Sequence, residues 1–182
     1  MDSFGTVEPN KRTTSFNVYY VTDRQPIVDS QTGALAGYSR HRSPYLCVGT
    51  AEVTIGRDLS WDELVAFSTS DKRGKDARLR VGAVTELVRF PGTPYNTHAL
   101  PDRCATYEEY LARLGVASAR ADMLLYTALD GQPEHRDVYV YIHGYNNTFE
   151  DAVFVMAGFW HFMGRHGLPV VFTWPAGAPG LT

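Results

Sequence analysis

The chain has little cysteine and no excess of charge of either sign. Its two cysteines, Cys47 and Cys104, lie far apart without the spacing of a metal site. One disulfide is optional in a domain of 182 residues, so we expect both thiols to be reduced. The 17 basic and 20 acidic residues give a formal net charge of −3. This balance offers no electrostatic reason to expect a nucleic acid or an anionic membrane as partner.

Long hydrophobic runs are also missing. No stretch approaches the roughly 20 apolar residues that cross a membrane, and the richest segment, 152–163, is short with polar flanks. Residues 1–14 are polar and lack the apolar region of a signal peptide. Apolar residues make up 44% of the chain, as is usual for globular domains. We therefore expect a cytoplasmic protein with a disordered arm at 1–14 and one domain at 15–182.

Several motifs of enzymes that use cofactors or nucleophiles are missing as well. The chain has no glycine-rich phosphate loop, which disfavours a nucleotide-dependent oxidoreductase, and we expect neither a cofactor nor a metal. No Gly-x-Ser-x-Gly sequence occurs; Ser39 follows Gly37 but lacks the second glycine and lies in an expected loop. His161 and His166 are five residues apart, which places them on different faces of a helix.

The pattern of apolar residues predicts an α/β fold. Alternating or continuous apolar segments indicate strands, helical spacing indicates helices, and the polar segment 23–43 indicates a long loop. Because helices connect the later strands, we expect a mainly parallel sheet with an antiparallel edge formed by the earlier strands. The expected strands are 16–21, 45–55, 78–88, 138–142 and 169–174, and the expected helices are 61–67, 106–115, 117–129 and 149–165.

One turn stands out, where the apolar strand 138–142 ends in His143-Gly144 and a helix begins a few residues later. Asn147 suits the helix cap, with Glu150 returning the hydrogen bond. Backbone amides at such a turn are free to bind a negative charge, and Gly144 leaves the approach open. On local grounds alone, the same residues also fit an ordinary structural turn, with Asn146 and Asn147 as turn residues and His143 as a structural hydrogen-bonding group.

The residues around this turn resemble a known family. The run Tyr139-Val-Tyr-Ile-His-Gly-Tyr-Asn-Asn-Thr-Phe-Glu-Asp-Ala-Val153 is similar to the signature of a bacterial α/β-hydrolase family of uncharacterised function, DUF900. That family follows the signature with a helix and a strand ending in Trp-Pro, as at Trp174-Pro175. The segments 18–24 and 49–55 are similar to its N-terminal strands.

The resemblance implies an α/β-hydrolase fold, incomplete at its C-terminus, and a serine hydrolase acting on a small ester or acyl substrate. The amides of Gly144 and Tyr145 would contribute to the oxyanion hole, and His143 would shape the turn. The nucleophile, the acid and the catalytic histidine would all follow Thr182, so none is named within the chain. The alternative is a truncated or degenerate homologue that serves as a non-catalytic binding module, with self-association through an uncovered sheet edge.

Overall fold

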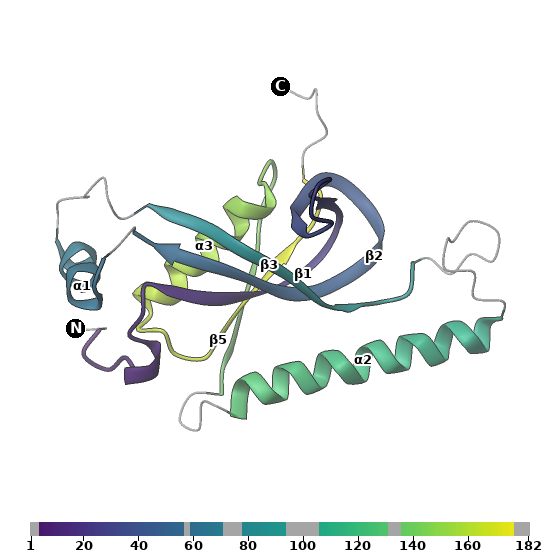
Figure 1. Cartoon of the computed structure of the whole chain (residues 1–182). Helices are drawn as coiled ribbons and strands as arrows, with labels where there is room; N and C mark the ends of the chain where they lie inside the picture. Colours follow the sequence, from purple (N-terminus) through teal and green to yellow (C-terminus); the bar gives the residue numbers. More distant parts are fainter. Residues whose placement is uncertain (1–3, 57–58, 71–77, 94–105, 131–135, 177–182) are drawn as a thin grey trace.

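A computed structural model describes residues 4–56, 59–70, 78–93, 106–130 and 136–176. Its centre is one five-stranded sheet in the order β3-β2-β1-β5-β4. One face is covered by helix α3 (Phe149–Phe162), while helix α2 (Tyr107–Asp130) lies along the other face (Figure 1). Helix α1 (Trp61–Thr69) and the short 3-10 helix η1 (Pro9–Lys11) lie at one end. The strands are β1 (Ser15–Val28), β2 (Leu35–Ile55), β3 (Leu79–Arg89), β4 (Val138–Ile142) and β5 (Leu168–Thr173).

The sheet is mixed, which confirms the α/β prediction in its coarse form. β5 pairs in parallel with both β1 and β4, whereas β2 pairs antiparallel with both β1 and β3. The described residues therefore form equal numbers of parallel and antiparallel pairs, and they do not confirm the expected parallel majority. The antiparallel edge lies where the sequence predicted it, in the first three strands.

The predicted loop at 23–43 is wrong. β1 and β2 continue through it as a long, irregular hairpin that closes at residues 29–34. The Asp29 carboxylate accepts the amide N–H groups of Gln31 and Thr32, which stabilises this turn. The polar composition hid the strands because much of this ribbon extends beyond the helices that bury the rest of the sheet (Figure 1).

The helices are close to their predicted positions, with one correction. The predicted capping box of α1 is present, with Ser60 as the cap and Glu63 as its partner. The two helices expected around Gly115 are one continuous helix, α2. A glycine in a helix costs only about 1 kcal/mol, which the rest of this 24-residue helix offsets. None of the helices in the described ranges is long and apolar enough to cross a membrane.

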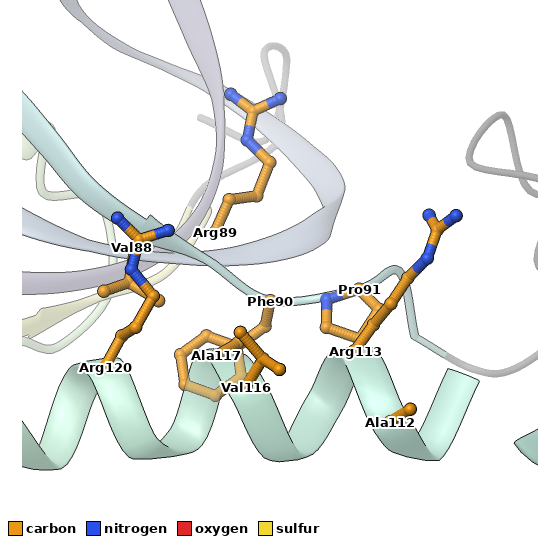
Figure 2. Close-up of a pocket in the computed structure, with 9 residues that line it drawn as sticks. All are labelled: Val88, Arg89, Phe90, Pro91, Ala112, Arg113, Val116, Ala117 and Arg120. Carbon is orange, nitrogen blue, oxygen red and sulfur yellow. The ribbon is translucent and has the colours of Figure 1, made fainter. Parts of the chain in front are cut away.

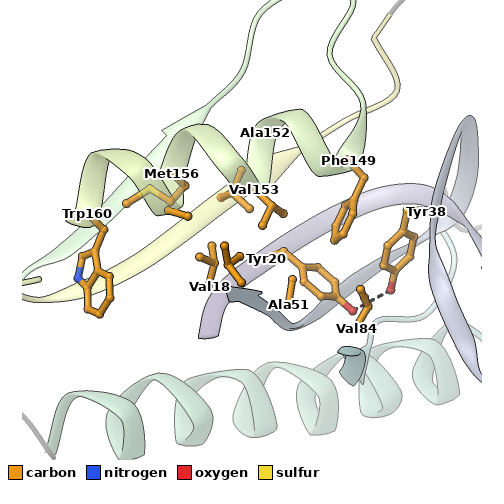
Figure 3. Close-up of a cluster of buried hydrophobic side chains, with 13 residues drawn as sticks. Val18, Tyr20, Tyr38, Ala51, Val84, Phe149, Ala152, Val153, Met156 and Trp160 are labelled. Atoms are coloured by element: carbon orange, nitrogen blue, oxygen red, sulfur yellow. Dashed lines mark hydrogen bonds between the residues drawn. The ribbon is translucent and has the colours of Figure 1, made fainter. Parts of the chain in front are cut away.

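The main core lies between α3 and the sheet (Figure 3). Val18 and Tyr20 of β1 point toward α3, which presents Met156 and Trp160 at helical spacing. The Tyr20 hydroxyl is 3.0 Å from the Tyr38 hydroxyl and donates to the backbone carbonyl of Thr85, also at 3.0 Å. The core therefore fixes the start of α3 relative to β1, and with it the turn that follows β4.

The disordered arm expected at 1–14 also needs correction for residues 4–14. Phe4 and Val7 are buried, with 8% and 1% of their surfaces exposed. The Arg165 guanidinium donates to the carbonyls of Lys11 at 2.7 Å and Thr13 at 2.6 Å. The segment is ordered because Phe4 and Val7 are buried and the Arg165 guanidinium binds its backbone. Its polar composition did not indicate these contacts.

Candidate functional site

The turn between β4 and α3 brings the predicted site residues to one end of the sheet. His143 is buried, whereas Gly144 and Tyr145 are exposed. Asn146 has a positive φ of 62°, a conformation that asparagine tolerates better than most residues, and its side-chain oxygen accepts a hydrogen bond from Arg40 at 2.8 Å. The chain thus turns sharply before α3 begins at Phe149.

The hydrogen bonds of His143 determine where its proton lies. Its Nε2 atom is 3.0 Å from the backbone amide nitrogen of Trp174, which can only donate, so Nε2 accepts. Nδ1 then carries the proton and donates to the carbonyl oxygen of Gly144 at 2.7 Å. The ring also stacks on the Trp174 indole, with 5.4 Å between centroids and 8° between planes. His143 is therefore a neutral group that holds the Gly144 carbonyl toward the protein interior.

Arg24 supports the turn from β1 and was missed by the sequence analysis. It is fully buried and donates to the Thr173 hydroxyl at 2.8 Å and to the carbonyl of Asn147 at 2.7 Å. Burial lowers the pKa of Arg24, and the nearby Arg40 lowers it further. The signal was present in the sequence, because the inward alternation of β1 at Val18, Tyr20 and Thr22 reaches position 24 next.

The helix cap lies one residue beyond its predicted position. Thr148 caps α3 and Asp151 completes the capping box, so the cap predicted at Asn147 with Glu150 is wrong. The hydroxyl and the backbone amide of Thr148 both donate to the Asp151 carboxylate, and these hydrogen bonds lower the pKa of Asp151. Asn147 supports the turn through its carbonyl instead, and Glu150 is exposed at the rim of a cavity of about 200 Å³.

The backbone amides of Gly144 and Tyr145 are the groups of this turn that remain available. The structure gives neither amide an acceptor among the described residues. A Cβ atom built on Gly144 would meet nothing within 4 Å, so the space in front of the turn is open. The site can therefore offer N–H donors to an anion or a polarised carbonyl, just before the N-terminal end of α3.

Ser68 and His161 form a second pair whose side chains could in principle serve as nucleophile and base. The proton of His161, however, lies on the wrong nitrogen for this role. His161 Nδ1 accepts from Arg165 Nε at 3.1 Å, so its proton lies on Nε2, which is 2.9 Å from the Ser68 hydroxyl. The imidazole therefore donates to Ser68 and has no lone pair with which to remove its proton. The described residues also contain no group of three or more His, Cys, Asp or Glu that could hold a metal ion.

His161 predicts a pH dependence of folding. Burial, with a smaller contribution from the Arg165 charge, lowers the pKa of His161 to about 4. In the unfolded chain the His161 imidazole binds a proton near pH 6.5, whereas in the folded chain it binds one only near pH 4. The free energy of unfolding therefore falls as the pH decreases from about 6.5 to about 4. We expect a loss of about 3 kcal/mol at pH 4 from this group, measured by urea unfolding across that range.

Two histidine variants isolate this contribution. His161→Gln removes the titrating group, so its free energy of unfolding should depend less steeply on pH between 6.5 and 4.5 than that of the original chain. His41→Gln, which replaces an exposed histidine, is the control. Equal slopes for the original chain and His161→Gln would contradict the prediction.

Comparison with known proteins supports the family resemblance. Residues 119–181 match the model of a family described as "Alpha/beta hydrolase of unknown function (DUF900)". No curated protein and no solved structure matches the chain. The matched segment includes the second half of α2 together with β4, the turn, α3 and β5, whereas β1, β2 and β3 lie outside it. Residues 119–181 of this chain are therefore similar to the DUF900 family of α/β-hydrolases.

Proposed function

We propose that the turn at 143–147 is the oxyanion-binding turn of a serine hydrolase that cleaves small esters or related acyl substrates. The observation that carries this proposal is the hydrogen bond from His143 Nδ1 to the Gly144 carbonyl. This bond holds the carbonyl inward and leaves the amides of Gly144 and Tyr145 without acceptors among the described residues. A preformed pair of donors needs no rearrangement when charge develops on a substrate.

The position of the turn suits that chemistry. In acyl transfer, a nucleophile adds to the substrate carbonyl, and the carbonyl oxygen becomes negatively charged in the tetrahedral intermediate. α/β-Hydrolases stabilise this oxygen with an N–H from the loop after the third strand and another from the residue after the nucleophile. Here the amides precede α3, whose N-terminal dipole adds a favourable field.

The remaining catalytic groups belong to sequence outside residues 1–182 in this proposal. No Gly-x-Ser-x-Gly occurs in the chain, and the pair of Ser68 and His161 has the wrong proton arrangement. His143 positions the turn and is not the general base, because Nε2 already accepts from Trp174 and Nδ1 donates to Gly144.

Labelling of the protein from its native source tests the proposal. We expect an intact mass above the 20.3 kDa of this chain, and a fluorophosphonate probe bound to a serine outside residues 1–182. The same reagent should abolish hydrolysis of p-nitrophenyl butyrate, and the isolated 182-residue chain should show no turnover. A mass of 20.3 kDa with no labelled serine and no turnover would overturn the proposal.

The second candidate function is a non-catalytic module that associates through β4, and one observation favours it. β4 pairs only with β5 among the described residues, and its outward side chains Val140 and Ile142 are 57% and 65% exposed. Beside it, Val155 and Phe159 of α3 border an apolar groove of about 410 Å³. An open apolar edge of this kind invites pairing with another strand.

A charge on this edge should reduce self-association. We expect the isolated chain to form oligomers whose size increases with concentration, and Val140→Lys to shift it toward monomer because a lysine blocks strand pairing. Sedimentation velocity at several concentrations measures the effect. Met123→Lys places the same charge on an exposed position of α2 and should leave the oligomers unchanged. A chain that is monomeric at every concentration would exclude this interaction.

A further inference from the structure

A cavity of about 400 Å³ lies between the end of β3 and the first half of α2 (Figure 2). Its floor is apolar, with Phe90 following β3 and Val116 and Ala117 provided by α2. Val88 and Pro91 extend this surface along the strand. The volume lies within the range of small-molecule sites, and the combination of apolar walls with a few polar groups is typical of them.

Two arginines border this apolar floor. Arg113 and Arg120 are seven residues apart, so they share one face of α2, with Val116 and Ala117 between them. Figure 2 shows both side chains rising from the helix toward the strand, Arg113 beside Pro91 and Arg120 beside Val88. The cavity therefore combines an apolar centre with a cationic rim.

The three arginines that line the cavity differ in their ion pairs with carboxylates. Arg89 points away from α2 in Figure 2 and contacts both carboxylate oxygens of Glu86, at 2.8 and 3.0 Å. Arg113 pairs with Glu109 at 2.7 Å, but both side chains are exposed, and such pairs contribute little. Arg120 forms no ion pair with the described residues. A bound anion would therefore meet Arg120, whose charge is not paired with a carboxylate among the described residues.

The cavity is separate from the turn at 143–147. Arg89 of β3 lies in one row across the sheet with residues of the next three strands. In order, these are Cys47 of β2, Thr22 of β1 and Thr173 of β5. β3 and β4 are the two edges of this sheet, four strand spacings apart, which is roughly 19 Å. A ligand in the cavity would therefore not contact the amides of the turn.

We propose that this cavity binds small amphipathic carboxylates, with the apolar tail against Phe90, Val116 and Ala117 and the carboxylate on Arg120 at one end of this floor. Guanidinium groups bind carboxylates through paired, charge-assisted hydrogen bonds. The apolar floor contributes through the burial of the tail. The proposal is independent of ester hydrolysis and requires no catalytic group.

Calorimetric titration of the full chain with octanoate tests the site. We expect saturable binding with one site per chain, and binding at least tenfold weaker for 1-octanol, which has the same tail without the charge. Arg120→Gln should weaken octanoate binding about tenfold, whereas Arg136→Gln, which removes an exposed arginine paired with Asp130, should not. Equal affinities for octanoate and octanol would overturn the role of Arg120.

Two further variants locate the binding. Ala112→Leu places a larger side chain at the cavity wall without removing a charge, and leucine suits a helix, so octanoate binding should weaken at least tenfold while folding is kept. Val155→Ser alters the separate groove beside β4 and should leave octanoate binding unchanged. Absence of saturable octanoate binding, or weakening by Val155→Ser instead of Ala112→Leu, would overturn the proposal.

Discussion

In the serine hydrolase that we propose, replacement of Tyr145 by proline is expected to lower kcat about 100- to 1,000-fold. Proline has no backbone N–H, so the substitution removes one of the two amides that we assign to the oxyanion. Removal of one such donor from other hydrolases has an effect of this size, equivalent to about 3 to 4 kcal/mol of transition-state stabilisation. The Tyr145 side chain is 62% exposed, so little packing is lost.

The control for this experiment is Tyr145→Ala, which removes the same side chain and keeps the amide. Its kcat for p-nitrophenyl butyrate should stay within a few-fold of the original value. Similar losses in both variants would assign the effect to the tyrosine side chain, and unchanged activity in Tyr145→Pro would exclude the amide from catalysis. Urea unfolding of each variant separates a loss of catalysis from a loss of folding.

Replacement of Gly49 by alanine is expected to destabilise the fold by about 3 kcal/mol or more. A Cβ atom at this position would lie 2.1 Å from the carbonyl oxygen of Thr85 and 2.3 Å from the Tyr20 hydroxyl. The first neighbour is backbone of β3 and the second is a buried ring, so neither moves aside easily. Relief of the clash would also break the hydrogen bond from Tyr20 to Thr85.

Thermal unfolding measures this effect, with an expected decrease in Tm of roughly 10 °C. The matched control is Gly115→Ala in α2, where a new Cβ atom meets nothing within 4 Å. Alanine favours helix over glycine by up to about 1 kcal/mol, so this variant should be slightly more stable than the original chain. A Gly49→Ala protein as stable as Gly115→Ala would show that β2 and β3 can separate without cost.

Local patterns were sufficient for the elements next to the turn. The continuous apolar run at 138–142 predicted β4 with its observed bounds, and Ser60 with Glu63 predicted the start of α1. These features depend on residues within a few positions of one another, so the sequence displays them directly. The same holds for His143-Gly144, whose place between a strand and a helix was predicted.

The long hairpin and the ordered N-terminal segment could not be predicted in this way. The strands at 23–43 are stabilised by pairing between β1 and β2, which polar residues support as well as apolar ones. Residues 4–14 are held by Arg165, more than 150 positions away. Composition cannot predict a contact between segments so far apart in the chain, because Arg165 and the polar residues 8–14 each have the composition of an exposed surface.

Residue patterns along the chain were enough to predict the α/β class, the strand-turn-helix unit at 138–162 and the similarity of residues 119–181 to the DUF900 family. How the turn is held became visible only in the fold, because Arg24 of β1, Thr173 of β5 and Trp174 after β5 contact His143 or Asn147 from distant parts of the chain. The fold also created the cavity at Phe90, since only the packing of α2 beside the end of β3 brings an apolar floor and two arginines together. Hydrogen bonds and cavities between distant segments depend on chain geometry, which residue spacing along one segment cannot encode.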